Sequence, residues 1–561
     1  MKHDFKSIPD RSSFGSAKWE IAKNASTEFV PLSVADMEFP TAKPIVEDIK
    51  KLADEAILGY TNPTQEYYDA VISWMKRRHD FDVKKEWLIQ TPGIINALSL
   101  LIETVTAPGD GVIVMSPVYY PFDMTIIATG RRSISCPLID NGGRYEIDYA
   151  LLEEKTKEHK NTALLFCNPH NPVGRVWTED ELRKTAEICC KNNVFIIDDE
   201  IHNDLIMPGY NHTVMANISE EAKECIAVCT APSKTFNLAG VQCSNIIIPN
   251  DEIRAKAAVR NKMNMQMHLN VFAYTICTAA YNKCEDWLDE LIGVIAENAR
   301  CVEAFMAENF PEIKVYPLEG TYLQWLDMRA LGMTHVELRE MLENANIYLD
   351  NGEMFGALGR GFQRINLACA KSTVEKMLER FKKAVEEVKS KEKTYHKHLE
   401  IGDIFDEINE NKTTLVVFAR APECSLTKKM LESINDKYAD FASAGIDVKF
   451  IVPSAEANRD YPFEIVADPE AELYKKYNVF EADSAVYAVA GDKMFEEAVG
   501  SDSDKIAESG VFAPADENAF RPLQLFAFVG VDKNKKIVYS YYSKTIGDFP
   551  DLSEIIDTLK S

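Results

Sequence analysis

The chain has 561 residues, more than one hydrophobic core usually organises, so its length predicts two or three domains. Hydrophobic residues make up 46% and charged residues 27%, which is the composition of an ordinary globular protein. A formal net charge of -26 argues against nucleic acids and anionic membranes as partners, because both need clustered Lys and Arg. The composition therefore favours a small-molecule ligand.

The N-terminal segment and the cysteines indicate the compartment. The first residues, MKHDFKSIPDRSS, lack the apolar region of a secretion signal, and no run approaches the roughly 18 apolar residues that a membrane span needs. Eleven of the twelve cysteines lie between Cys136 and Cys369, mostly in apolar segments and without a CxxC pair. Cys189 and Cys190 are adjacent on a predicted helix, a poor geometry for a disulfide or a metal site. We therefore expect buried reduced thiols, no metal and a cytoplasmic location.

Short apolar runs alternate with longer amphipathic stretches in the first half of the chain. The helical candidates include GIINALSLLIETV and TEDELRKTAEICCKNN. Continuous apolar strands separated by helices predict an α/β fold with a mostly parallel sheet covered on both faces. The predicted strands are WLIQ from Trp87, GVIVM from Gly111, ALLFC from Ala163, VFIID from Val194 and CIAVCT from Cys225.

A distinctive cluster follows each predicted strand. Ligands of such sheets bind beyond the carboxyl ends of the strands, so the five clusters should meet at one edge. Each cluster alone could be turn chemistry, a helix cap or a solvated lysine. Together they supply an amine, a carboxylate, an aromatic ring and a phosphate cradle, the parts that pyridoxal phosphate requires. The clusters are TPGII at 91, SPVYYPF at 116, NPHNPVG at 168, DDEIHND at 198 and APSKTFN at 231.

Residues 1 to about 390 resemble the fold-type I pyridoxal phosphate enzymes, and more narrowly the MalY/PatB family of cystathionine beta-lyases and cysteine carbon-sulfur lyases. The resemblance implies a large part over about residues 46–285 and a small α+β part from residues 1–45 and 286–390. It also implies cleavage of L-cystathionine or a related cysteine thioether to pyruvate, ammonia and a thiol. The matching stretches are VADMEFPTA, GYTNP, NPHNPVG, DDEIH, SKTFN and GRGFQRINLAC.

The resemblance also assigns roles around the cofactor ring. Lys234 would form the Schiff base with pyridoxal 5'-phosphate, and Asp199 would face the pyridine nitrogen and keep it protonated. Asn171 would hydrogen-bond the cofactor's phenolic oxygen beside the substrate, and Tyr119 would stack on the ring. His202 lies three residues after Asp199, where many aminotransferases have Tyr, and this departure favours the lyase reading.

Further residues would hold the phosphate and the substrate. The amides of Ile94 and Ile95, with Ser233, would bind the phosphate. Tyr60 of the GY motif would reach the phosphate of a neighbouring subunit, which implies a homodimer. Arg364 would bind the α-carboxylate of an amino-acid substrate through a bidentate fork.

Two other functions stay open on the sequence alone. The carbanion that leads to elimination can instead be protonated on the cofactor, so an aminotransferase of L-amino acids is the first alternative. Ala231 and Gln242 stand where many aminotransferases carry a hydroxyl residue and an arginine, so the phosphate contacts of this chain must differ from theirs. The second alternative is a regulatory protein that retains the fold to bind a partner.

A second unit follows a charged seam. We place a linker at residues 391–410 and a further domain at 411–561, which resembles thioredoxin-like and peroxiredoxin-like domains. LVVFARAPECS sets Cys424 after a predicted strand and before a predicted helix, where a thiol has a depressed pKa. Arg521 and Pro522 fall where such domains place an arginine and a cis proline.

The thioredoxin-like resemblance is incomplete. Val417 and Ala421 replace the Pro and Thr of the peroxiredoxin motif, and Thr427 stands where a thioredoxin has its second cysteine. A redox-active thiol and a structural or partner-docking module therefore both remain open for this domain.

Overall fold

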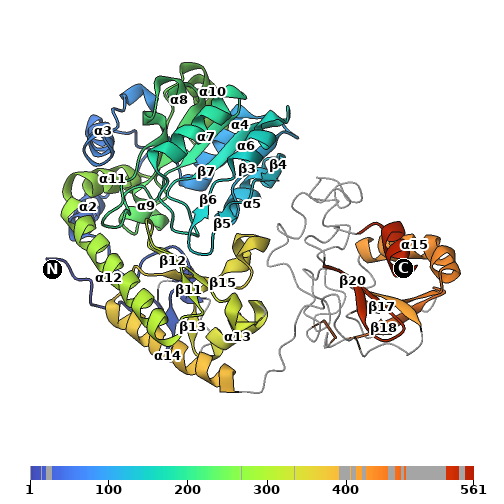
Figure 1. Ribbon diagram of the computed structural model, residues 1–561. Helices are drawn as coiled ribbons and strands as arrows, with labels where there is room; N and C mark the ends of the chain where they lie inside the picture. The colour runs from blue at the N-terminus through green and yellow to red at the C-terminus, as the bar shows by residue number, and fades with distance from the viewer. Residues whose placement is uncertain are drawn as a thin grey trace. The chain divides into compact units, whose positions relative to one another are not determined.

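A computed structural model of the chain divides into two compact units, one comprising nearly all residues up to 393 and the other the residues from 394 onward (Figure 1). The structure describes residues 2–13, 15–20, 28–266, 268–333, 335–390, 405, 412–419, 425–452, 461–468, 473–474, 526–542 and 550–560.

A seven-stranded sheet forms the centre of the first unit, in the order β2-β10-β9-β8-β7-β3-β4. Strand β10 runs antiparallel to both of its neighbours, and the other paired strands are parallel. The predicted mostly parallel sheet and its five apolar strands are thus confirmed. The strands are β2 (Leu88–Thr91), β3 (Gly111–Val114), β4 (Arg132–Ser135), β7 (Asn161–Cys167), β8 (Phe195–Asp199), β9 (Ile226–Thr230) and β10 (Ser244–Ile247).

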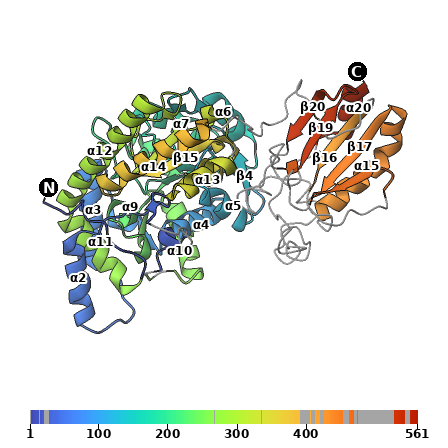
Figure 2. The same cartoon turned by 90° about the horizontal axis from the view of Figure 1, so that it is seen from below.

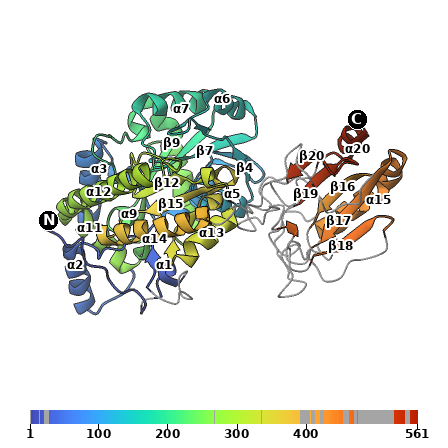
Figure 3. The same ribbon diagram turned by 60° about the horizontal axis from the view of Figure 1, so that its bottom comes forward.

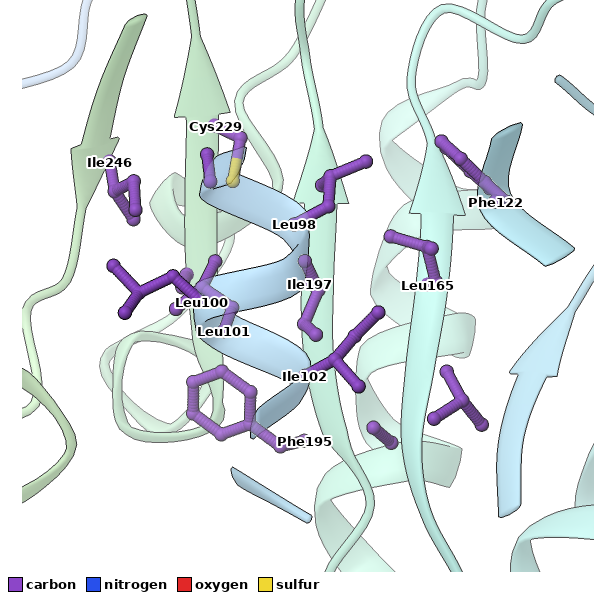
Figure 4. Close-up of a cluster of buried hydrophobic side chains, with 14 of the residues drawn as sticks. Leu98, Leu100, Leu101, Ile102, Phe122, Leu165, Phe195, Ile197, Cys229 and Ile246 are labelled. Atoms are coloured by element: carbon purple, nitrogen blue, oxygen red, sulfur yellow. The ribbon is translucent and has the colours of Figure 1, made fainter. Parts of the chain in front are cut away.

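Helices cover both faces of this sheet, with α6 and α7 on one side and α4, α5 and α10 on the other (Figure 2). Figure 4 shows Leu98, Leu101 and Ile102 of α4 lying over buried strand residues of the sheet. These side chains are fully buried, so α4 is held firmly against the strands that it follows. The helices are α4 (Ile94–Val105), α5 (Pro121–Ala128), α6 (Tyr149–Lys157), α7 (Glu179–Lys191), α8 (Glu220–Cys225) and α10 (Asp251–Met263).

A smaller antiparallel sheet, β11-β12-β15-β14, completes the first unit with the helices around it (Figure 3). Parallel pairing of β1 with β13 joins the N-terminal segment to this part. The strands are β1 (Val30–Pro31), β11 (Lys314–Val315), β12 (Leu323–Asp327), β13 (Ile347–Tyr348), β14 (Asp350–Asn351) and β15 (Phe362–Asn366). The helices are α1 (Ala17–Glu20), α2 (Lys43–Asp54), α3 (Gln65–His79), α11 (Val271–Lys283), α12 (Glu285–Asn309), α13 (His335–Asn344) and α14 (Lys371–Ser390).

The second unit has a five-stranded sheet of its own, in the order β18-β17-β16-β19-β20, with a separate hydrophobic core. Cys424, Arg521 and Pro522 lie outside the described residues, so the thioredoxin-like resemblance stays a prediction. Its elements are β16 (Thr413–Phe418), α15 (Ser425–Ser443), β17 (Ile446–Val452), β18 (Glu464–Ala467), β19 (Ala527–Val531), β20 (Ile537–Tyr542) and α20 (Leu552–Lys560).

The cysteines differ from expectation at one pair. The structure joins Cys190 of α7 to Cys225 of α8 in a disulfide, with Cα atoms 6.0 Å apart, so the expectation of reduced thiols throughout is wrong. Cys189 points into the core, whereas its half-buried neighbour Cys190 lies where α7 packs against α8. Only tertiary packing brings the two half-buried thiols together. The nine other described cysteines are free, and all except Cys301 are buried.

Among the described helices, none combines the length and the apolar character that crossing a bilayer requires.

Candidate active site

The predicted site residues follow the carboxyl ends of the central strands. Asp199 is the last residue of β8, and Asn171 lies four residues beyond β7. Lys234 lies in the short helix α9 (Pro232–Thr235), directly after β9, and Tyr119 follows β3. Because these strands are parallel neighbours, their ends deliver the amine, the carboxylates, the amide and the phenol to one edge of the sheet.

Lys234 is held in a half-buried position by a backbone carbonyl. Its Nζ donates a hydrogen bond to the Ala35 carbonyl oxygen at 2.6 Å. Burial lowers the pKa of Lys234 to about 8, and the positive charge of Arg364 acts in the same direction, against the carboxylates of Asp36 and Asp199. Near neutral pH a much larger fraction of this amine is therefore uncharged than of an ordinary lysine, and the uncharged form is the nucleophile.

Asp199 is a buried carboxylate close enough to Lys234 for their charges to interact. Burial raises the pKa of Asp199 to about 7, and the hydrogen bond from the Ile201 amide, at 3.2 Å, partly opposes this shift. A cation placed against the carboxylate would favour its ionised form.

Arg364 is oriented by a carboxylate that the sequence argument did not identify. The antiparallel register of β14 and β15 sets Asp350 opposite Arg364. Both Nε and Nη2 of Arg364 donate to Asp350 Oδ2, and Nη1 donates to Asn171 Oδ1 at 2.7 Å. The guanidinium has five N–H groups, so one remains on each of Nη1 and Nη2. These two form a fork that suits a second carboxylate.

The turn before α4 is a candidate anion cradle, formed by Gly93 and the backbone amides that begin the helix. Gly93 has a φ of 86°, and a Cβ at this position would lie 2.6 Å from the Gln242 side-chain oxygen. Glycine is therefore the residue that fits this turn without strain. The amides of Ile94 and Ile95 begin the helix, where backbone N–H groups lack partners within the helix. Gln242 borders the cradle, at the position where many aminotransferases have an arginine.

Two aromatic side chains and a histidine border the same edge. Tyr119 is half-buried, and burial raises the pKa of its phenol above the ordinary value. His202 is buried, with its pKa lowered by burial well below the usual range, so its ring is neutral. It packs edge-on against Tyr322 at 5.8 Å between ring centroids. Its Nδ1 has no hydrogen-bond partner among the described residues, which leaves a polar atom available to a bound group.

The surroundings of the two other predicted phosphate contacts, Ser233 and Tyr60, do not indicate an anion site. Ser233 is half-buried within α9, and its carbonyl oxygen accepts a hydrogen bond from the Leu238 amide at 2.8 Å. Tyr60 is fully exposed in the single chain, where its ring lies 6.4 Å from that of His268. The single chain therefore gives Tyr60 no role within its own site.

The N-terminal segment contributes residues whose roles sequence reasoning missed. Asn366 Nδ2 donates to the carbonyl oxygens of Val34 and Asp36, at 2.7 and 2.6 Å, and thereby holds the carbonyl of Ala35 over Lys234. Asp36 is in turn paired with Arg11 at 2.8 Å. The sequence signal for these roles is the stretch VADMEFPTA, which is family-like and carries acidic residues within an apolar run.

Comparison with known proteins agrees with this architecture. Residues 27–381 match the family model of aminotransferase class I and II. The chain is 39% identical over 385 residues to cystathionine beta-lyase PatB of Bacillus subtilis, an alignment that covers 68% of this chain and 100% of that protein.

Solved structures give the same result. Cystalysin of Treponema denticola, whose structure contains a pyridoxal 5'-phosphate cofactor, is 46% identical with a TM-score of 0.68, covering 69% of this chain and all of that one. A pyridoxal phosphate-bound C-S lyase of Staphylococcus hominis is 30% identical with a TM-score of 0.64, covering 69% of this chain and 98% of that one. The chain belongs to the aminotransferase class I and II family.

Proposed function

We propose that this chain is a pyridoxal phosphate-dependent carbon-sulfur beta-lyase that cleaves L-cystathionine or a related cysteine thioether to pyruvate, ammonia and a thiol. The observation that carries the proposal is the meeting of Lys234, Asp199 and Arg364 at one sheet edge. The relatives named cystathionine beta-lyase and C-S lyase support it.

The residues present fit the cofactor. Lys234 offers an amine of lowered pKa, Asp199 a buried carboxylate for the ring nitrogen, and the start of α4 a set of amides for the phosphate. Asn171 directs its Oδ1 to Arg364, so its Nδ2 remains to donate to the phenolic oxygen. Tyr119 would cover the ring. When bound, pyridoxal phosphate supplies an electron sink for negative charge at the substrate's α carbon.

The protein's own groups would position the substrate and move its proton. The free N–H groups of Arg364 would hold the α-carboxylate. Asp350 would keep the guanidinium in the plane of that carboxylate. Lys234 Nζ, with its lowered pKa, would accept the α proton and could return it to the leaving sulfur. The buried, neutral His202 and Tyr322 would exclude water from that proton transfer.

We also propose that the working form is a homodimer. The first unit exposes large apolar side chains on α10, just after it and on the segment that contains Tyr60, whose ring lies 6.4 Å from that of His268. Contiguous exposed apolar surface is typical of interaction sites. A second copy would cover them and give Tyr60 a phosphate partner. Sedimentation of the purified chain tests this, and a monomer that is fully active would contradict it. The side chains are Ile57, Leu58, Tyr60, Val259, Met263 and Met265.

The decisive experiment is product release from L-cystathionine without an added oxo acid. The lyase gives pyruvate, ammonia and a thiol in equal amounts, whereas an aminotransferase gives product only when an oxo acid is supplied. Lys234→Ala should release none, because it removes the amine that we place at the substrate's α carbon. Lys157→Ala, which changes an exposed lysine on α6, is the matched control and should behave as wild type. Turnover that depends strictly on an oxo acid would assign the chain to the aminotransferases.

A further inference from the structure

A second group of buried polar side chains lies next to Lys234 and takes no part in the chemistry described above. Its centre is Asp204, in the turn that follows β8. The Asp204 carboxylate accepts hydrogen bonds from Trp74 Nε1 at 3.0 Å, from His79 Nε2 at 2.8 Å and from Thr235 Oγ1 at 2.8 Å. Trp74 and His79 lie on α3, whereas Thr235 is the residue directly after Lys234. Two distant segments, α3 and α9, therefore converge on one carboxylate.

The protonation states fix the direction of these bonds. Burial acts to raise the pKa of Asp204, but the hydrogen bond and charge of His79 and the hydroxyl of Thr235 outweigh it, and the pKa lies below the ordinary value. Burial lowers the pKa of His79, and the hydrogen bond to Asp204 acts against this shift. An ionised carboxylate only accepts hydrogen bonds, so Thr235 must donate its hydroxyl proton to Asp204. The Thr235 side chain is thereby held in one orientation.

Helix α9 needs such an external contact. It has four residues, and its flanking backbone bonds include those from the Phe236 amide to the Pro232 carbonyl, at 3.0 Å, and from the Leu238 amide to the Ser233 carbonyl. So short a helix has little stability of its own. Beyond Lys234, the Asn237 side chain bonds the backbone of the N-terminal segment. Asp204, in the turn after β8, supplies a corresponding contact to Thr235, one residue after the lysine.

We propose that Asp204 is a positioning residue that acts through Thr235 to fix α9, so that the Lys234 amine points to the place where the cofactor's aldehyde is held. The inference rests on the proposed function, because it requires Lys234 to attach the cofactor. Without the Thr235 hydroxyl, α9 can rotate and the amine spends less time in the reactive orientation. Arg364 lies on β15 and would still bind the substrate's carboxylate.

The test uses two substitutions of Thr235 in the full chain. Thr235→Val keeps the shape and removes the donor, whereas Thr235→Ser keeps the donor. Cofactor attached to Lys234 is trapped with borohydride at increasing pyridoxal phosphate concentrations and counted by mass spectrometry, and kcat and KM are measured on L-cystathionine. We expect Thr235→Val to need about tenfold more cofactor for half-maximal trapping and to lose about tenfold in kcat, with KM changed less than about twofold. Thr235→Ser should stay close to wild type.

Trp74→Phe is the matched control, since it removes one bond to the same carboxylate and keeps an aromatic ring against Phe236, the residue that caps α9. A positioning role predicts that this variant traps the cofactor like wild type. Equal losses in Trp74→Phe and Thr235→Val would show that Asp204 only stabilises the core and would overturn the proposal. Wild-type trapping by Thr235→Val, or a loss in Thr235→Ser as large as in Thr235→Val, would also overturn it. A wild-type chain that traps the cofactor but releases no pyruvate would contradict the proposed function alone, since the trapping comparison does not depend on elimination.

Discussion

Burial changes the pKa values of single residues in this site, and their proposed roles depend on these changes. Burial brings the pKa values of Lys234 and Asp199 close together, to about 8 for the lysine and about 7 for the aspartate. The pKa values of an exposed lysine and an exposed aspartate differ by roughly six units. Desolvation is the main cause for both groups, because each is less stable as a charge when water is removed. Groups with pKa values near neutrality can exchange protons with a bound molecule at small free-energy cost.

The first prediction concerns the reactivity of Lys234 in the cofactor-free chain. Because only the uncharged amine reacts, its rate of acetylation should rise with pH to a half-maximum near 8, since burial lowers its pKa to about 8. Peptide mapping after brief acetylation at a series of pH values measures this. The exposed Lys157 on α6 is the internal control. A common titration curve for both lysines would show that burial does not shift Lys234.

The second prediction concerns Arg364. Arg364→Ala should raise KM for the amino-acid substrate by roughly 30-fold, equivalent to about 2 kcal/mol, because the carboxylate loses a charged fork. Pyridoxal phosphate binding should change little, since Arg364 faces Asp350 and Asn171. Steady-state kinetics and cofactor titration measure the two effects separately.

The same substitution leaves Asp350 buried without its partner and should destabilise the fold. The double variant Arg364→Ala, Asp350→Ala should recover part of the lost stability while KM stays high, which separates substrate binding from folding. Loss of the cofactor with unchanged substrate affinity would show that Arg364 has a different role.

At the scale of elements, short connections at the sheet edge carry the chemistry and long helices hold them in place. The α4 helix packs its apolar residues on the sheet, so its first turn presents amides at a fixed position (Figure 4). The register of β14 with β15 similarly fixes Asp350 against Arg364. The short helix α9 has four residues, and hydrogen bonds from Asp204 and from the N-terminal segment hold it on two sides of Lys234.

The third prediction addresses the turn before α4. Gly93→Ala should lower the free energy of unfolding by about 1 to 2 kcal/mol, because a φ of 86° is strained for any residue with a Cβ. It should also weaken cofactor binding, since the added methyl group meets the Gln242 side chain at the cradle. Denaturant unfolding of the cofactor-free chain and cofactor titration measure the two effects. Gly143→Ala is the control, because a Cβ at that exposed turn meets no atom within 4 Å. Equal stability of the two variants would contradict a strained cradle.

At the scale of the whole molecule, two units with separate hydrophobic cores divide the chain. The family match ends at residue 381, and the relatives cover about two thirds of the chain. The proposed lyase residues all lie in the first unit. The second unit contains Cys424, the one cysteine beyond the family-like region.

The fourth prediction is that Cys424 alkylates faster at neutral pH than the cysteines of the first unit. Its predicted place at a helix start should lower its pKa below the roughly 8.5 of an ordinary thiol. The described free cysteines of the first unit are mostly buried, and burial raises the pKa of the Cys136, Cys284 and Cys369 thiols to about 12. Mass-spectrometric mapping at limiting reagent compares the sites, with Cys424→Ser as the control. Labelling of Cys424 no faster than the rest would favour a structural or docking module.

Local sequence patterns were enough to predict a mostly parallel sheet, five of its seven strands with their carboxyl ends, and the family. Apolar runs mark buried parallel strands, and the residues that follow each run must lie at the carboxyl edge. Tertiary structure alone decided which groups orient the reactive ones. The hydrogen-bonded partners Asp350 and Arg364, Asp204 and Thr235, and Ala35 and Lys234 are 14, 31 and 199 residues apart. Strand register and packing bring such pairs together, and neither is written in the residues next to each partner. The disulfide between Cys190 and Cys225 was missed for the same reason, since it depends on where α7 meets α8.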